Sequence, residues 1–257
     1  MTDSEPGDVI IVGASLGGLM TALALAPHGM RIRLLERSTD TDRTGAALQV
    51  DDGLLQRLMG RQAAGTRSIV SGIQTWHAVH AGLCAVAAGE PNIRIDRNIR
   101  VESVGQDDRS AWVKTGDGQR LSAQIVIGAD GYQSVVRRAV SPERPDAVFA
   151  GYLAWVGFSQ EANVPARFPR HLDMLDSGPY NMLGFPLPGH DGSHEPGRRQ
   201  IGWAWYDAGR NDLLRASGAV SGTLVRHSLR PPISRKRSSP IWPGRPAASG
   251  PRPGARR

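Results

Sequence analysis

The stretch that decides the fold is Val9-Ile10-Ile11-Val12-Gly13-Ala14-Ser15-Leu16-Gly17-Gly18-Leu19. A short apolar run ends there in a glycine turn, which opens into an alanine- and leucine-rich helical stretch that continues to Leu25. A second apolar run, residues 32–35, ends in Glu36. This order of strand, turn, helix and strand lays a nucleotide pyrophosphate on the N-terminus of a helix. It predicts a dinucleotide-binding unit rather than a glycine-rich turn that binds nothing.

Several residues of this unit have a defined role in such a site. Gly13 permits the tight turn after the strand, and Gly18 lets the helix and strand pack closely. Ser15 stands where glycine usually gives the closest backbone approach to phosphate, and its hydroxyl can bond a phosphate oxygen. Glu36 is placed to bond ribose hydroxyls. The expected cofactor-binding residues of this unit are Gly13, Ser15, Leu16, Gly17, Gly18, Glu36 and Arg37.

A second strand-to-turn unit, Val126-Ile127-Gly128-Ala129-Asp130-Gly131, precedes the start of another helix. Asp130 can accept hydrogen bonds from ribose hydroxyls, and Gly131 lets the backbone come close to a ligand. Ser134 can cap the helix, and Arg137 offers a positive charge to a phosphate. Taken alone, the pattern is also typical of an Asp-Gly turn followed by a helix cap, with no ligand.

The remaining pattern predicts an α/β protein. Apolar residues at helical spacing indicate helices over 51–59, with Asp51 or Asp52 as N-cap, and over 75–88. Strands expected at 92–96, 101–106, 111–115 and 121–127 form a small β-meander inserted between the halves of a parallel sheet, with a hairpin turn at 115–118. From residue 151 onward, strand-like runs separated by glycine, proline and aspartate predict a mostly antiparallel sheet.

The expected fold is thus a Rossmann-like nucleotide-binding domain over 1–148 and a partial antiparallel β-sheet domain over 149–212. Residues 213–257 are assigned to a basic tail rich in arginine and proline. The stretch 212–224 is ambiguous, with a short helix as one interpretation. We expect disorder from about residue 225. No internal repeat is found.

The net charge of +7 is unevenly distributed. No acidic residue follows Asp212, whereas ten of the 31 Lys and Arg residues do. The part up to Asp212 is therefore mildly acidic, which makes nucleic acid an unlikely partner. A basic-tailed adaptor for acidic partners has only the charge of the tail in its favour.

Other features limit the location and the chemistry. No apolar stretch approaches the length of a membrane span, and the polar N-terminus differs from a signal peptide. The single cysteine, Cys84, fits a reducing compartment, so we expect a cytoplasmic protein. We interpret Cys84 as a packed small residue, and His77 and His80 as surface or packing histidines. We therefore expect no metal site and name no catalytic residue.

Three stretches give the chain a resemblance to a known family. They are Gly13-Ala14-Ser15-Leu16-Gly17-Gly18 with Glu36-Arg37, then Arg43-Thr44-Gly45-Ala46-Ala47-Leu48-Gln49, then Gly128-Ala129-Asp130-Gly131-Tyr132-Gln133-Ser134-Val135-Val136-Arg137. With them the chain resembles the FAD-dependent aromatic hydroxylases of the para-hydroxybenzoate hydroxylase type. Thr75-Trp76 and Gln200-Ile201-Gly202-Trp203-Ala204-Trp205-Tyr206 are similar to the 2,6-dihydroxypyridine hydroxylase branch.

The resemblance implies an FAD-dependent monooxygenase that uses NAD(P)H as co-substrate and hydroxylates a small aromatic or N-heteroaromatic ring. Gly13, Ser15 and Gly18 would hold the FAD pyrophosphate, and Glu36 would bind the adenosine ribose. The resemblance adds three further residues: Arg43 near the pyrophosphate or the nicotinamide, Asp130 at the cofactor, and Arg137 near the nicotinamide. A surface role for Arg43 stays equally open, and a flavoprotein reductase of the same fold is a further alternative.

The resemblance ends near residue 212. The family continues with a Gly-Asp motif followed by Ala-Ala-His that contacts the flavin, and this sequence does not contain it. The simultaneous change to an acid-free, Arg- and Pro-rich composition predicts a C-terminally truncated or frameshifted member. Such a chain would have impaired hydroxylation, and the alternative is an inactive flavoprotein fragment that retains at most nucleotide binding.

Overall fold

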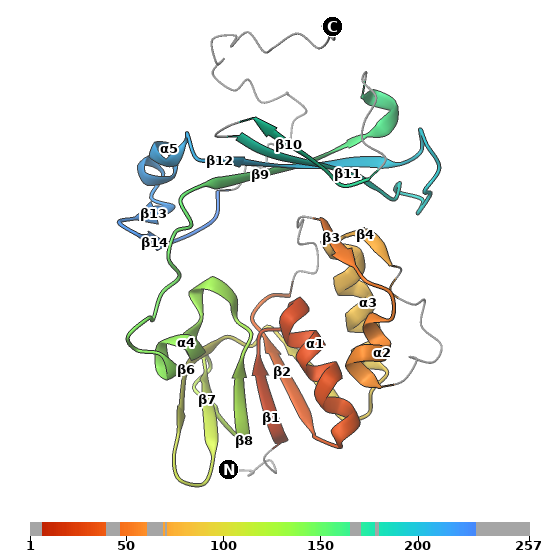
Figure 1. The fold of residues 1–257 in the computed structure, drawn as a ribbon. Coiled ribbons are helices and arrows are strands. Elements are labelled where there is room, and N and C mark those ends of the chain that lie inside the picture. The colour runs from red at the N-terminus through yellow and green to blue at the C-terminus, as the bar shows by residue number, and fades with distance from the viewer. Residues whose placement is uncertain are drawn as a thin grey trace, which may run out of the picture. The chain divides into compact units, whose positions relative to one another are not determined.

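The computed structural model describes residues 7–39, 47–60, 69, 71–164, 171–177 and 180–229. Strand β1 (Gly7–Val12) lies between β2 (Ile32–Glu36) and β8 (Arg120–Gly128) and runs parallel to both (Figure 1). Val9 and Ile11 pack on one face of the sheet and Ile10 and Val12 on the other. A strand that is buried on both faces needs a continuous apolar run, which explains the sequence of β1.

The nucleotide-binding part contains one sheet of six strands, in the order β5-β2-β1-β8-β7-β6. Strand β5 (Ile93–Arg97) pairs in parallel with β2. Strand β7 (Ala111–Thr115) pairs antiparallel with both of its neighbours, β6 (Val101–Gln106) and β8. The expectation that residues 92–96 belong to the meander is wrong. The helix before β5 returns the chain to the start of the sheet, so the next strand is parallel to β2. The hairpin at 115–118 is confirmed by the bond from Gly118 N–H to the Thr115 carbonyl.

Helices cover both faces of this sheet. Helix α1 (Leu16–Leu25), which continues into a 3₁₀ turn, and α3 (Trp76–Ala88) pack with β1 and β2 in one core. Helix α4 (Val135–Val140) packs against β6 and β8 in the other core. Thr75 caps α3 by accepting a hydrogen bond from Ala78 N–H at 3.2 Å.

Helix α2 (Leu54–Met59) begins later than its sequence pattern indicates. Neither Asp51 nor Asp52 is its N-cap, because that position belongs to Gly53. Gly53 has a φ of 70°, a left-handed conformation that excludes it from a right-handed helix. Between β2 and α3 the chain also forms a two-stranded antiparallel sheet of β3 (Ala47–Val50) and β4 (Gly72–Thr75).

The predicted antiparallel sheet is confirmed as four strands in the order β10-β11-β12-β9. Its strands are β9 (Leu153–Gln160), which ends in a 3₁₀ turn, β10 (Asp173–Ser177), β11 (Tyr180–Leu187) and β12 (Gln200–Asp207). Strand β11 contacts β4 of the nucleotide-binding part. The described residues up to His227 belong to one compact unit, so the domain boundary at 148 stays a prediction.

The regular structure continues beyond residue 212, where the sequence pattern is ambiguous over 212–224, with a short helix as one interpretation. Helix α5 (Asn211–Ala216) is followed by a small hairpin of β13 (Val220–Ser221) and β14 (Leu224–Val225). This hairpin bonds to residues 147–149, since Phe149 N–H donates to the Thr223 carbonyl and Val148 bridges Leu224. Disorder was expected from about residue 225. From residue 230 onward this segment lies outside the described part of the chain.

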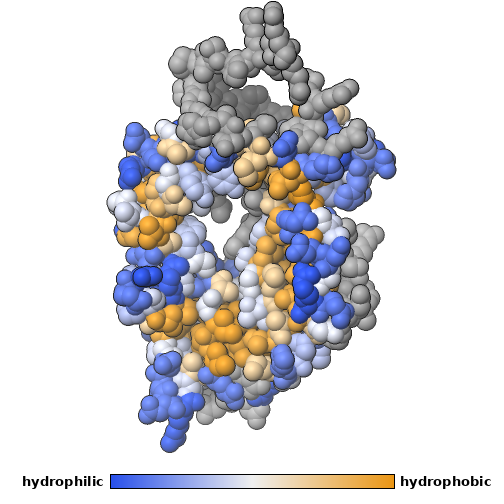
Figure 2. All heavy atoms as spheres, viewed as in Figure 1, coloured by the Kyte–Doolittle hydropathy of each residue, from blue (hydrophilic) through white to orange (hydrophobic). Residues whose placement is uncertain are grey.

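Hydrophobic and hydrophilic residues gather over different elements of the nucleotide-binding part. Figure 2 shows hydrophobic residues gathered over the region of β1 and α1, while the tip of the β6–β7 hairpin is hydrophilic. That tip carries Asp107, whose carboxylate accepts hydrogen bonds from the backbone N–H groups of Arg109 and Ser110. Among the described helices, none is long and apolar enough to cross a membrane.

An ion pair joins the end of β9 to the start of β12. The Glu161 carboxylate accepts hydrogen bonds from the Arg199 guanidinium and from Gly197 N–H. The bond from Arg199 holds the pKa of Glu161 below its usual value, against the opposing effect of burial. Because the folded pKa is depressed, the stabilisation is present above the ordinary glutamate pKa of 4.5 and is lost as the pH falls through the folded value.

We therefore expect Glu161→Gln to lower the free energy of unfolding by about 1 kcal/mol at pH 7. The difference from the wild-type chain should shrink steadily below about pH 4.5. Urea unfolding of both chains from pH 7 to pH 3 measures this. A difference that is the same at every pH would show that the charge of Glu161 is not its cause.

Candidate functional site

A cleft of about 650 Å³ lies at the carboxyl ends of β1, β2 and β8. This volume is in the range of small-molecule and cofactor sites, and open α/β sheets bind their ligands at this edge. Its lining residues are Val12, Gly13, Ser15, Gly17, Leu35, Glu36, Arg37, Ile99, Arg100, Val101, Glu102, Ala129, Asp130, Gly131, Tyr132, Gln133, Val135 and Arg138.

The two glycine-containing turns meet at this cleft. Gly13 N–H donates to the Leu35 carbonyl and Ala129 N–H donates to the Val12 carbonyl, both at 2.8 Å. Gly13 has a φ of 101°, and a Cβ atom on it would lie 2.4 Å from the Ala129 carbonyl oxygen. The turn after β1 therefore needs glycine both for its conformation and for its contact with the turn after β8.

The N-terminus of α1 opens onto the cleft. Ser15 is the N-cap residue, and its hydroxyl makes no capping bond. A Cβ atom on Gly17 would meet nothing within 4 Å, whereas one on Gly18 would lie 1.9 Å from the Gly13 carbonyl oxygen. The first amides of a helix have no acceptor within the helix, and its dipole favours a negative charge there. This end of α1 can therefore accept a phosphate group close to Gly17.

Glu36 connects the end of β2 to the glycine turn. Its side chain is buried, and its two carboxylate oxygens accept from Ala14 N–H and from Ser38 N–H, each at 2.9 Å. A carboxylate has about four acceptor positions. Glu36 thus holds the turn in place, and it lines the cleft, where a carboxylate can accept from the hydroxyls of a ligand.

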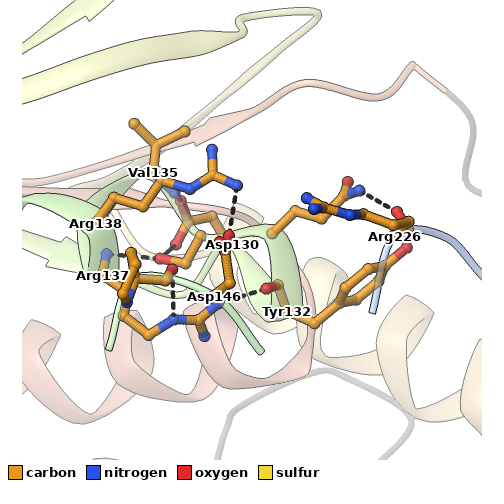
Figure 3. Close-up of polar contacts among 10 residues, drawn as sticks. Asp130, Tyr132, Val135, Arg137, Arg138, Asp146 and Arg226 are labelled. Atoms are coloured by element: carbon orange, nitrogen blue, oxygen red, sulfur yellow. Dashed lines mark hydrogen bonds and ion pairs between the residues drawn. The ribbon is translucent and has the colours of Figure 1, made fainter. Parts of the chain in front are cut away.

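Asp130 organises the turn after β8 (Figure 3). Its carboxylate accepts from the Ser134 hydroxyl at 2.5 Å and from Val135 N–H at 2.7 Å. Ser134 in turn accepts from Arg137 N–H at 2.9 Å and is the N-cap of α4, as its position in the sequence predicts. The helix cap is therefore present, and Asp130 also lines the cleft. Contact between Asp130 and a cofactor stays a prediction.

The arginines beside this turn are engaged with the protein (Figure 3). The Arg137 guanidinium donates to the carbonyls of Tyr132 and Pro145, and Arg137 is not among the residues that line the cleft. Arg138 does line the cleft and pairs with Asp146 at 2.9 Å. The expected role of Arg137 at a nicotinamide is therefore a prediction that requires it to leave these carbonyls.

Most of the expected cofactor residues come together in the cleft. The expected residues that line it are Gly13, Ser15, Gly17, Glu36, Arg37, Asp130 and Gly131. Leu16 and Gly18 are not among its lining residues, although Gly18 packs against the Gly13 turn. Arg43 lies outside the described residues.

The segment 99–102 lines the cleft although the sequence pattern did not indicate it. Ile99 N–H donates to the Glu36 carbonyl at 2.9 Å, which brings this segment to the end of β2. The feature of the sequence that could have placed this segment at the cleft was the helix before β5. It makes β5 parallel to β2, so the residues that follow β5 must emerge at the same edge of the sheet.

We expect Asp130→Ala to destabilise the chain by about 1–2 kcal/mol, because α4 loses the acceptor for its first amides. Thermal unfolding measures this loss. Asp146→Ala, which removes only the partner of Arg138, is the comparison and should cost less than about 1 kcal/mol. Equal losses in the two variants would contradict the capping role of Asp130.

The comparison with protein families gives a match to the family described as FAD binding domain, over residues 7–62 and 74–175. The matched residues make up more than half of the chain. The chain belongs to the FAD-binding monooxygenase family. The match includes both turns of the cleft and ends inside β10.

Two relatives are named for reactions on small aromatic rings. The chain is 24% identical to 2,6-dihydroxypyridine 3-monooxygenase of Paenarthrobacter nicotinovorans, over 86% of this chain and 61% of that enzyme. It is also 24% identical to 3-hydroxybenzoate 6-hydroxylase of Klebsiella oxytoca, over 80% of this chain and 61% of that enzyme. The chain thus spans about three fifths of the length of these relatives.

Solved structures share this fold. The 2,6-dihydroxypyridine-3-hydroxylase from Arthrobacter nicotinovorans matches with a TM-score of 0.59 and 22% identity, over 78% of this chain and 56% of that one. CtdE in complex with FAD matches with a TM-score of 0.58 and 16% identity, over 79% of this chain and 59% of that one. The chain therefore shares its fold with these solved structures.

The residues of the cleft fit the nucleotide part of FAD. The open start of α1 suits the pyrophosphate, and the Glu36 carboxylate suits a ribose diol. Gly131, with a φ of 81° and nothing within 4 Å of a Cβ atom placed on it, leaves space for a ligand beside the second turn. The geometry of the cleft therefore agrees with the assignment of this chain to the family described as FAD binding domain.

Proposed function

We propose that this chain acts as an FAD-dependent monooxygenase that hydroxylates a small aromatic or N-heteroaromatic ring with NAD(P)H and O2. The observation that carries the proposal is the family match across both turns of a cleft that fits the nucleotide part of FAD. The names of the two relatives support the class of substrate. A cytoplasmic location is part of the proposal.

In this proposal the side chains bind and orient, and bound FAD supplies the redox chemistry with NAD(P)H and O2. The amides at the start of α1 and the Ser15 hydroxyl hold the pyrophosphate, and Glu36 holds the ribose. Arg43, Asp130 and Arg137 assist the flavin or the nicotinamide. The antiparallel sheet provides the wall for the aromatic ring. No side chain is assigned as an acid or base.

A second candidate is a flavoprotein that binds the nucleotide without turnover. The exposed apolar side chains of the antiparallel sheet favour it, because Val156, Phe158 and Met174 are 42%, 38% and 62% exposed. Exposed apolar side chains that gather on one surface mark a ligand groove, an interaction site or an aggregation hazard. Their exposure supports weak flavin binding and little hydroxylation by this chain alone.

A spectrum and a turnover assay separate the two candidates. The purified chain is titrated with FAD, and binding is measured at equilibrium from the change in flavin fluorescence. NADH and NADPH oxidation is then followed with and without 2,6-dihydroxypyridine and 3-hydroxybenzoate. Near-stoichiometric flavin with ring-stimulated oxidation and a hydroxylated product supports the monooxygenase. Bound flavin without product supports the second candidate, and a chain that binds no flavin at equilibrium contradicts both.

A further inference from the structure

His80 lies on α3 and is buried, whereas His77, three residues earlier on the same helix, is exposed. The Nε2 atom of His80 lies 2.9 Å from the carbonyl oxygen of Ala14 in the glycine turn after β1. A carbonyl oxygen only accepts, so Nε2 carries a proton and donates to it. The imidazole is held by Trp76, whose ring stacks on it with centroids 4.5 Å apart and an interplanar angle of 12°.

The hydrogen bond from His80 to the Ala14 carbonyl determines the direction of the Ser15 N–H. The Ala14 carbonyl and the Ser15 N–H belong to one planar trans peptide, in which the two groups point in opposite directions. Since His80 holds the carbonyl on the side of α3, the Ser15 N–H is directed away from α3. Ser15 lines the cleft. A donor on the carbonyl also polarises the peptide and makes its N–H a stronger donor.

The peptide on the other side of Ala14 is held by Glu36, which accepts from Ala14 N–H at 2.9 Å. Two side chains distant in sequence therefore fix consecutive peptides of the turn. Cys84 Sγ, one turn further along α3, lies 3.9 Å from Nδ1 and 3.8 Å from Nε2 of His80, and 3.7 Å from an Arg97 nitrogen. The bond with Cys84, and next the Ala14 carbonyl, raise the pKa of His80 against the opposing effect of burial.

We propose that His80 is a positioning residue for the pyrophosphate of FAD, which holds the peptide between Ala14 and Ser15 so that the Ser15 amide faces the phosphate. The assignment rests on FAD binding by this chain and requires no turnover. It gives α3 a role at the cofactor. His80 itself does not line the cleft.

Three variants of the full chain test the proposal. His80→Leu removes the donor, His80→Gln retains an N–H near the place of Nε2, and His77→Leu is the control on the exposed face of α3. Hydrogen–deuterium exchange of the apoprotein over residues 9–19 reports the turn without any cofactor. Titration with FAD, followed by flavin fluorescence, reports the affinity, and thermal unfolding is recorded for every variant.

We expect His80→Leu to increase exchange over 13–19 and to raise the Kd for FAD about tenfold. His80→Gln should remain within about twofold of the wild-type chain, and His77→Leu should match it. Wild-type exchange and affinity in His80→Leu would overturn the proposal, as would equal weakening in the Leu and Gln variants, which indicates packing alone. A wild-type chain that binds no FAD would overturn the cofactor assignment, while the apoprotein exchange would still show whether His80 holds the turn.

Discussion

Gly18→Ala is expected to destabilise the chain by about 3 kcal/mol or more and to abolish FAD binding. A Cβ atom at this position would lie 1.9 Å from the Gly13 carbonyl oxygen, which is backbone and cannot rotate away as a side chain could. Either α1 or the turn must move, and each carries part of the cleft. For a chain of this size the thermal midpoint should fall by roughly 6–12 °C, measured by circular dichroism.

Gly17→Ala is the matched control for this change. It lies in the same helix, one residue earlier, and its added methyl group would meet nothing within 4 Å. Because alanine is favoured over glycine in a helix by about 1 kcal/mol, the control should be as stable as the wild-type chain or slightly more so. If both variants unfold at the same temperature, close packing of α1 on the turn is not required.

The second large effect is expected at Glu36. Glu36→Leu keeps an apolar side chain of similar size but leaves the N–H groups of Ala14 and Ser38 without the acceptor they have in the native chain. An unsatisfied buried donor costs about 1–3 kcal/mol, so stability should fall by about 2–4 kcal/mol. Loss of the charged acceptor for the ribose should also raise the Kd for FAD by about 10- to 100-fold.

Two comparisons separate these contributions. Glu36→Gln keeps one acceptor oxygen but no charge, so its stability should lie between those of the wild-type and Leu chains. Glu102→Gln removes a charge from an exposed residue at the same cleft and should change the Kd less than about threefold. Urea unfolding and FAD titration measure both properties. An unchanged affinity in Glu36→Leu would contradict the assignment of this carboxylate to the ribose.

The unit of β1, α1 and β2 was predictable because its residues act locally. A buried parallel strand needs an apolar run, and a tight turn into a helix needs glycine. The placement of 92–96 was not predictable from alternation alone, since a strand pattern does not show its partner. The start of α2 was missed for a related reason. Asp51 and Asp52 resemble caps, but the left-handed conformation of Gly53 decides where the helix begins.

In the candidate site, too, locally determined features were predictable, whereas contacts between distant segments were not. Seven expected cofactor residues line the cleft because the two turns carry recognisable glycines. The segment 99–102 was missed because its place depends on the pairing of β5 with β2. His80 was interpreted as a packing residue, since nothing near it in the sequence points to the Ala14 carbonyl. A contact between distant segments becomes visible only when the topology is known.

The pairing of β1 with β8 also determines when the cleft can form. Val12 pairs with Gly128, and almost half of the chain lies between these two residues. Contacts that close such long loops form late, because the loss of chain entropy on closure is offset only by the interactions that form after pairing. During synthesis the glycine turn therefore leaves the ribosome long before its neighbouring strand exists. We expect the nucleotide to bind only after this last closure, so that FAD would slow unfolding without accelerating folding.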